Sequence, residues 1–263
     1  SKGLRRGWAV WDANAAAVRV SDPVLDPLAD FLAADKVDFL KHEGMFFEVG
    51  RRTDALLGAF IWTTRRGQGC GGIRLRPYAD VEEYVRDGMR LAIGMGRKSA
   101  LAGLWAGGAK GVIAQQPGDK HTDPAYRREL MHDYGEFLSS LRGCYVAAED
   151  VGLNVADCDG VFAKTRFMTC ISAELGGSGN PSVPTAAGVL AAMEGAVDFL
   201  GLGAGGGSLR GMRVAVQGTG NVGLPLIKNV IARGARVIRP FEGVDDRSAA
   251  FVTPAILDMT GVD

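Results

Sequence analysis

Residues 212–223 read MRVAVQGTGNVG, and this stretch decides the fold of the chain's C-terminal part. The run 212–217 predicts a buried strand, a glycine turn follows without a break, and residues 224–233 predict a helix. A second strand is expected over residues 235–238. Strand, helix and strand in this order form the repeating unit of a parallel α/β sheet.

The glycine turn fits the GxGxxG pattern of dinucleotide-binding loops, which here comprises Gly218, Thr219, Gly220, Asn221, Val222 and Gly223. Its glycines would make a tight turn, admit a pyrophosphate and let the helix pack closely on the strand. The alternative is a glycine turn that binds nothing. An acidic residue after the next strand usually binds the ribose, and Glu242 is the candidate, whereas Arg239 would favour a 2′-phosphate. We therefore predict NAD as the cofactor and leave NADP open.

Upstream of this unit, the hydrophobic pattern predicts a further α/β region with a boundary near residue 180. Residues 1–20 show no clear period. The pattern predicts strands over 45–49, 55–64, 112–114 and 145–148, and helices over 28–40, from 80 to near 98, after 122–124, over 155–163 and up to 200. We expect two domains, residues 1–180 and residues 181–263, the second an incomplete Rossmann-type domain.

Composition excludes several classes of protein. The chain has 263 residues, 47% of them hydrophobic, and 30 basic residues balance 30 acidic ones, so no charge pattern for nucleic acid or a membrane surface is present. The sequence contains no run of about 18 apolar residues and no apolar core of a signal peptide. The four cysteines form no CxxC pair, which predicts free thiols and a cytoplasmic location. The three histidines are not spaced as a metal-binding pair, so no metal site is expected.

Three charged residues are candidates for chemistry. Lys110 lies in WAGGAKGVI (105–113), where apolar flanks would lower its pKa toward values useful for proton transfer. Lys98 lies twelve residues earlier, and two lysines in one cleft suit an anionic small substrate. Asp150 follows a short apolar strand, where it could exchange protons with an amine. The structural alternatives are an idle lysine in a turn, a lysine at a helix C-terminus and a capping aspartate.

The ordered motifs resemble one family. GGIR (71–74), Lys98, GGAKGVI (107–113), AEDVG (148–152), SGNPS (178–182) and VQGTGNVG (216–223) occur in the order seen in the glutamate/leucine/phenylalanine/valine dehydrogenases. The leucine and phenylalanine branch is the most similar, and the resemblance covers roughly residues 55–238. It implies an N-terminal α/β substrate and oligomerisation domain, a homo-oligomer and oxidative deamination of an L-amino acid to its 2-oxo acid and ammonia.

The resemblance also implies a role for each matched residue. Lys98 would bind the α-carboxylate, Lys110 would activate water, and Asp150 would handle the amino proton. Thr185 would lie near the nicotinamide carboxamide. The substrate pocket would include Cys70, Gly71 and Gly72. Glutamate enzymes carry a lysine where Cys70 stands, and a buried acidic side chain without a cation is costly, so we expect an apolar amino acid.

One departure leaves a second interpretation open. Family members continue beyond the point where this sequence ends, and the tail EGVDDRSAAFVTPAILDMTGVD (242–263) does not resemble them. A single β-α-β unit also leaves a sheet edge unpaired. The alternative to a working dehydrogenase is therefore a truncated, catalytically impaired homologue that acts as a structural or oligomerisation domain.

Overall fold

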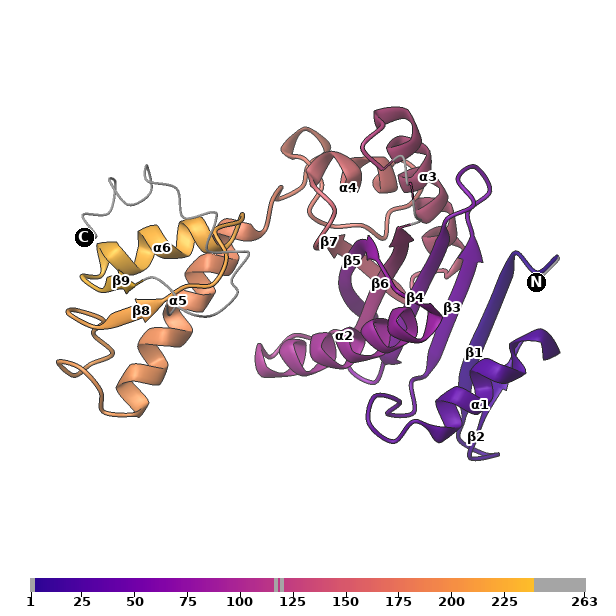
Figure 1. Cartoon of the computed structure of the whole chain (residues 1–263), viewed down its shortest axis with the longest axis horizontal. Helices are drawn as coiled ribbons and strands as arrows, with labels where there is room; N and C mark the ends of the chain where they lie inside the picture. The colour runs from indigo at the N-terminus through magenta and orange to yellow at the C-terminus, as the bar shows by residue number, and fades with distance from the viewer. Residues whose placement is uncertain (1–2, 116–117, 119–120, 239–263) are drawn as a thin grey trace. The chain divides into compact units, whose positions relative to one another are not determined.

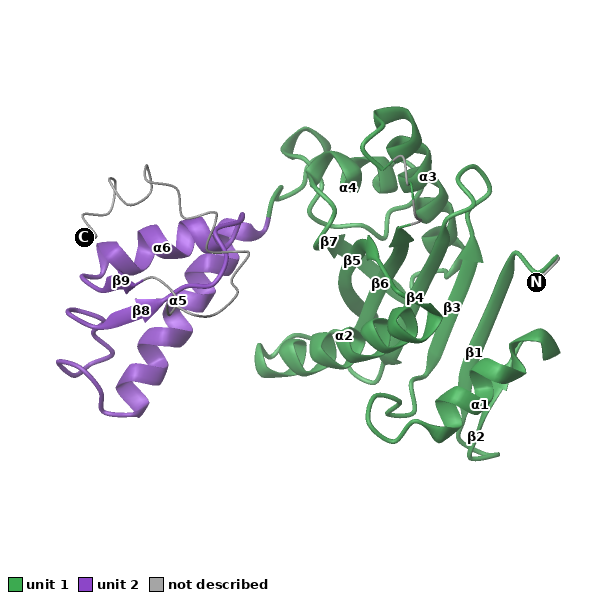
Figure 2. Ribbon diagram, in the orientation of Figure 1, with its two compact units in different colours: residues 1–180 green, residues 181–263 purple. Residues whose placement is uncertain are grey.

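The computed structural model describes residues 3–115, 118 and 121–238. The chain divides into two compact units, residues 1–180 and residues 181–263 (Figure 2). Each unit has its own hydrophobic core, and each is described by itself.

The first unit is built on a seven-stranded mixed sheet in the order β2-β1-β3-β4-β6-β5-β7 (Figure 1). Only β5 with β6 and β5 with β7 pair in parallel, and the other neighbours are antiparallel. The strands are β1 (Arg6–Asp12), β2 (Ala17–Val20), β3 (Gly44–Val49), β4 (Leu56–Thr63), β5 (Gly69–Pro77), β6 (Gly107–Gln115) and β7 (Tyr145–Glu149).

Helices cover both faces of this sheet. One face packs against α1 and α2 and the other against α3 and α4. Side chains of Asp80, Asp123 and Asn154 cap the starts of α2, α3 and α4, satisfying backbone amides that have no partner within the helix. The helices are α1 (Asp26–Ala34), α2 (Val81–Leu101), α3 (Pro124–Ser140) and α4 (Val155–Phe162), with short 3₁₀ turns η1 (Pro23–Leu25) and η2 (Ala173–Leu175).

The alternation of side chains along β6 decides which way Lys110 points. Val112 packs in the core beneath α2, whereas Ala109 and Ile113 pack in the core beneath α3. Successive side chains of a strand point to opposite faces. Lys110 therefore shares the α2 face of the sheet with Val112.

The second unit contains the predicted β-α-β arrangement. Its elements are α5 (Ser182–Phe199), β8 (Arg213–Ala215), α6 (Gly223–Ala232) and β9 (Arg236–Ile238). The two strands pair in parallel, with Val214 opposite Val237, and α5 and α6 share an apolar core. The α/β fold class and the parallel pairing predicted from residues 212–238 are confirmed.

Three local predictions need correction. No element was expected within residues 1–20, which show no period, but β1 and β2 form an antiparallel pair there at one edge of the sheet. The helix expected over 28–40 ends at Ala34, because Asp35 accepts hydrogen bonds from the next amides and turns the chain. The stretch around Lys110 is a strand from Gly107 onward and not a turn.

Candidate active site

Lys110 and Asp150 form a close ion pair in the first unit. Lys110 Nζ lies 2.7 Å from Asp150 Oδ2, and the side chain of Lys110 is only 5% exposed while that of Asp150 is 22% exposed. Lys110 projects from the middle of β6, and Asp150 follows the last residue of β7. Strand β5 lies between these two strands, so the pair spans it on the α2 face.

Glycines let these strands approach closely enough to make the pair. A Cβ at Gly72 would lie 2.6 Å from the Cβ of Asp150 and 2.7 Å from the carbonyl oxygen of Glu149. A Cβ at Gly71 would lie 1.9 Å from the carbonyl oxygen of Ala109. Real Cβ atoms do not come this close to other atoms, so only glycine fits at both positions. The Gly71 carbonyl also accepts a hydrogen bond of 2.8 Å from the buried Tyr145 hydroxyl.

Burial and neighbouring charges shift the pKa values of both partners. Burial lowers the pKa of Lys110, with Asp150 opposing the shift and the nearby cations Arg74 and Lys98 adding to it. Burial acts to raise the pKa of Asp150, but the Lys110 ammonium and the Arg74 guanidinium outweigh it and hold that pKa below its ordinary value. A buried lysine with a lowered pKa next to an ionised carboxylate is suited to proton transfer.

Lys98 and Cys70 lie on two different elements of the same unit, α2 and β5. Lys98 is exposed in the last turn of α2, and its charge acts on Lys110, which fits an anion held between the two lysines. Cys70 stands on β5 beside Gly108 of β6. Burial raises the pKa of the Cys70 thiol, which keeps the side chain neutral.

Arg74 joins the site without having been predicted as a site residue. Its Nε lies 3.0 Å from Asp150 Oδ2, the same oxygen that Lys110 contacts, and its Nη1 lies 3.4 Å from Asp87 Oδ1 on α2. The sequence did carry a signal, since Arg74 and Arg76 alternate on a strand whose other residues are apolar or glycine. Buried or half-buried cations in such a strand need partners of opposite charge, so the pattern predicts carboxylates close to these arginines.

The predicted dinucleotide loop lies in the second unit. Gly218 has a φ of +86°, and a Cβ at Gly223 would lie 2.0 Å from the Gly218 carbonyl oxygen, so both positions require glycine. A Cβ at Gly220 would meet nothing within 4 Å, which leaves open space at the position predicted to face a pyrophosphate. Helix α6 follows with no side-chain cap on its N-terminus. These features fit a dinucleotide phosphate.

The remaining predicted cofactor residues are less informative. Thr185 lies in the first turns of α5, where its hydroxyl donates to the Pro181 carbonyl at 2.7 Å. Glu242 lies outside the described residues. Across the part of the chain that the structure describes, no three His, Cys, Asp or Glu side chains gather as a metal site would require, and no helix is long and apolar enough to cross a membrane.

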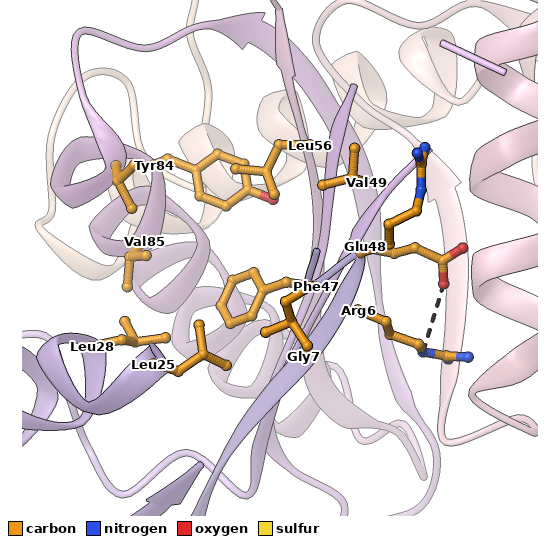
Figure 3. A pocket seen from close by; sticks show the side chains of 13 residues that line it. Arg6, Gly7, Leu25, Leu28, Phe47, Glu48, Val49, Leu56, Tyr84 and Val85 are labelled. Atoms are coloured by element: carbon orange, nitrogen blue, oxygen red, sulfur yellow. Dashed lines mark ion pairs between the residues drawn. The ribbon is translucent and has the colours of Figure 1, made fainter. Parts of the chain in front are cut away.

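A separate cavity lies away from this ion pair, beneath the start of α2. It is lined mainly by apolar side chains, with Arg6 and Glu48 paired at 3.6 Å on its rim (Figure 3). None of the predicted substrate residues lines it. The cavity is therefore not the predicted substrate pocket.

The family of the chain follows from two matches. The model for the Glu/Leu/Phe/Val dehydrogenase dimerisation domain matches residues 57–167, and that for Glutamate/Leucine/Phenylalanine/Valine dehydrogenase matches residues 176–261. The second match includes most of the tail 242–263, so the expectation that the tail does not resemble the family is wrong. A core built on a mixed sheet, followed by a β-α-β unit with a GxGxxG loop, agrees with both. The chain belongs to the glutamate/leucine/phenylalanine/valine dehydrogenase family.

Individual relatives agree with this assignment. The chain is 42% identical over 178 residues to leucine dehydrogenase of Geobacillus stearothermophilus, a match that covers 68% of this chain and 46% of that enzyme. It is also 42% identical over 178 residues to valine dehydrogenase of Streptomyces virginiae, covering 68% and 48% respectively. The matched region thus spans slightly less than half the length of these relatives.

Solved structures show the same fold. L-Tryptophan dehydrogenase from Nostoc punctiforme superposes with a TM-score of 0.56 at 26% identity, covering 84% of this chain and 58% of that one. The hetero-hexameric glutamate dehydrogenase from Thermus thermophilus superposes with a TM-score of 0.60 at 22% identity, covering 99% of this chain and 56% of that one. At this identity the second match supports the fold alone.

Proposed function

We propose that this chain carries the catalytic centre of an NAD-dependent dehydrogenase that oxidatively deaminates an apolar L-amino acid to its 2-oxo acid and ammonia. The observation that carries the proposal is the 2.7 Å pair of the buried Lys110 with Asp150. Its support is the chain's membership of an amino-acid dehydrogenase family.

The residues suit the proton transfers of this reaction. Lys98 would hold the substrate α-carboxylate, and the ionised Asp150 would accept a proton from the substrate ammonium. A bound nicotinamide would supply the hydride acceptor for the substrate Cα, which leaves an imine on the substrate. Neutral Lys110 would take a proton from the water that attacks the imine carbon. Asp150 would then return its proton to the nitrogen. The C–N bond breaks and ammonia leaves, while the carbinol hydroxyl proton passes to solvent and the C=O bond of the 2-oxo acid forms.

The preference for an apolar side chain rests on the surroundings of Cys70. Its neutral, half-buried thiol offers no cation to a distal carboxylate, and burying an unpaired carboxylate is costly. The named leucine and valine dehydrogenases act on apolar amino acids, which favours the same class here. We expect glutamate to be a poor substrate.

The cofactor would be held by the loop of residues 218–223. The open space at Gly220 and the uncapped start of α6 are what a pyrophosphate needs. We propose NAD as the preferred form, with Thr185 near the carboxamide and Glu242 as the candidate ribose partner. Competition between NAD and NADP in the same assay tests this preference.

We further propose that the chain forms a homo-oligomer in the cytoplasm. Strand β2 ends the sheet with one backbone edge that no described strand pairs, and such edges favour pairing with another chain. The solved relative from Thermus thermophilus is a hetero-hexamer. All four cysteines are free thiols, as expected in a reducing compartment. Light scattering of the purified chain measures its mass in solution.

A panel of L-amino acids tests the proposed reaction. Nicotinamide reduction is followed by absorbance with leucine, valine, phenylalanine and glutamate, using wild type, Lys110→Ala and the matched control Lys36→Ala. Lys36 is exposed, and its Nζ donates a hydrogen bond of 2.9 Å to the Ala33 carbonyl. We expect turnover of apolar amino acids in wild type and in the control, and none in Lys110→Ala. Absence of both turnover and calorimetric NAD binding in wild type would favour the non-catalytic alternative.

A further inference from the structure

Arg74 is bound on two sides by carboxylates from different elements. Its Nε contacts Asp150 Oδ2 at 3.0 Å and its Nη1 contacts Asp87 Oδ1 at 3.4 Å, and its side chain is 21% exposed. Asp150 lies in a loop after β7, and Asp87 lies within α2. The planar guanidinium can contact two carboxylates at once from fixed directions, which an ammonium does less well.

Asp87 is itself held in place. Its Oδ2 accepts a hydrogen bond of 2.9 Å from the Tyr78 hydroxyl, and Arg76 Nε lies 3.5 Å from the same oxygen. Arg76 in turn contacts Glu83 at 2.7 Å. A continuous line of charges therefore runs from α2 through Arg74 to the candidate catalytic pair, so the helix fixes the position of the guanidinium.

Asp150 needs such a fixed partner. It follows the last residue of β7, outside the ladder of strand hydrogen bonds, and is more exposed than Lys110. Lysine side chains are flexible and hold a carboxylate as a point charge, without directional control. Arg74 comes from the neighbouring strand β5 and contacts the same oxygen as Lys110.

We propose that Arg74 is a positioning residue, whose guanidinium ties Asp150 to Asp87 and so fixes the Asp150 carboxylate against the Lys110 ammonium. The inference rests on the proposed function for its catalytic consequence, but the contact itself does not depend on it.

The charges that surround Lys110 predict the direction in which its pKa changes when Arg74 is replaced. They are Asp150 after β7, Arg74 on β5 and Lys98 on α2. Arg74 lowers the pKa of Lys110 by repulsion and shares the carboxylate that would otherwise act on Lys110 alone. Removing its charge should therefore raise the pKa of Lys110, because both effects change in the same direction.

The test compares Arg74→Gln, Arg74→Lys and the matched control Arg76→Gln. Arg76 lies on the same strand and contacts Asp87 but not Asp150. Lys110 is titrated by NMR in full-length protein labelled with [13Cε]lysine, and its signal is assigned by its loss in Lys110→Arg. We expect the Lys110 midpoint to rise by about one pH unit in Arg74→Gln, and by less in Arg74→Lys. The rise should be least in Arg76→Gln, which loses a contact to Asp87 but none to Asp150.

Turnover gives the second measurement. In Arg74→Gln, kcat should fall with KM nearly unchanged, and its pH profile should move to higher pH by the shift seen in the titration. An unchanged Lys110 midpoint, or the same shift in Arg76→Gln, would overturn the inference. Should Arg74→Gln fail to fold, Arg74→Lys replaces it in the test. A rise of the Lys110 midpoint in Arg74→Lys supports the inference, and an unchanged midpoint overturns it. If wild type shows no turnover but the pKa of Lys110 still rises in Arg74→Gln, the proposed function is refuted and the positioning role of Arg74 is supported.

Discussion

Replacing Gly72 by alanine tests how the strands deliver Asp150 to Lys110. The added methyl carbon would lie 2.6 Å from the Asp150 Cβ and 2.7 Å from the Glu149 carbonyl oxygen. Gly94 provides a matched control, because it is an exposed glycine in α2 whose added Cβ would meet nothing within 4 Å. Both variants add one methyl group to the same unit.

The contact distances set the expected size of the effect. Carbon atoms rest about 3.5–4.0 Å apart, so the end of β7 must move by roughly 1 Å to admit the methyl group. Overpacking of this kind costs about 1–3 kcal/mol of unfolding free energy. A misplacement of about 1 Å also costs on the order of 100-fold in rate. Gly94→Ala should instead stabilise the helix by about 1 kcal/mol and leave turnover unchanged.

Tryptophan fluorescence isolates the unit in question. All four tryptophans lie in the first unit, namely Trp8, Trp11, Trp62 and Trp105. A denaturant or thermal transition followed by this signal therefore reports the unit that holds Lys110 and Asp150. One kcal/mol corresponds to a change in midpoint of roughly 2–4 °C for a domain of this size. Turnover is measured on the same samples.

Wild-type turnover and stability in Gly72→Ala would show that the added methyl group does not clash with β7. A shift of the midpoint in the same direction and by a similar amount in Gly72→Ala and Gly94→Ala would refute the clash as well. A loss of stability without a loss of turnover would show that β7 moves in a way that leaves the ion pair intact.

Three further predictions concern other parts of the chain. Gly220→Ala should fold normally but weaken NAD binding about tenfold or more, since its methyl group would take the space of the pyrophosphate. Gly223→Ala should instead be destabilised, because its Cβ would lie 2.0 Å from a backbone oxygen. Calorimetry measures the loss of NAD binding, and melting curves measure the loss of stability. Burial lowers the pKa of His42 from 6.5 to about 4, so the folded state resists protonation and the stability present above pH 6.5 is lost as the pH falls toward 4. Between pH 7 and pH 5 we expect a loss of about 2 kcal/mol in wild type and a flatter profile in His42→Gln, measured by denaturant titration; equal slopes would contradict this. Asp133 is 3% exposed and accepts hydrogen bonds from two amides, a hydroxyl and a guanidinium, so Asp133→Ala should cost about 2–4 kcal/mol in a chemical denaturation curve, and a cost near zero would show that those donors find other partners.

The sequence predicted the structure best where a regular hydrophobic pattern adjoins glycines that a tight turn requires. The GxGxxG loop could be placed because a strand before it and a helix after it are the context in which the pattern has a mechanism. The fold class followed from the same alternation. The roles of Lys98, Lys110 and Asp150 in catalysis stay predictions, although Lys110 and Asp150 are in direct contact.

Other features were beyond reach for physical reasons. Strand β6 resembles a turn in sequence because its glycines serve the close approach of α2, where a Cβ at Gly108 would lie 2.4 Å from the Ala92 carbonyl oxygen. Strand β2 alternates between exposed and half-buried residues, but its four residues are too short a run to predict a strand from the sequence. The alternation of Arg74 and Arg76 indicates that these cations need carboxylate partners, but it does not identify the partners of Arg74. Asp87 and Asp150 are distant from Arg74 in sequence and meet it only when α2 folds over the sheet.

Transfer of deuterium from the substrate tests the central claim most directly. Wild-type protein is incubated with L-leucine deuterated at Cα and with NAD, and the reduced nicotinamide is analysed by mass spectrometry. We expect one deuterium in the reduced cofactor in wild type and none in Lys110→Ala. Unlabelled cofactor in wild type, or equal labelling in the Lys110→Ala variant, would contradict the assignment of Lys110 and Asp150 as the proton-transfer pair of an amino-acid dehydrogenase.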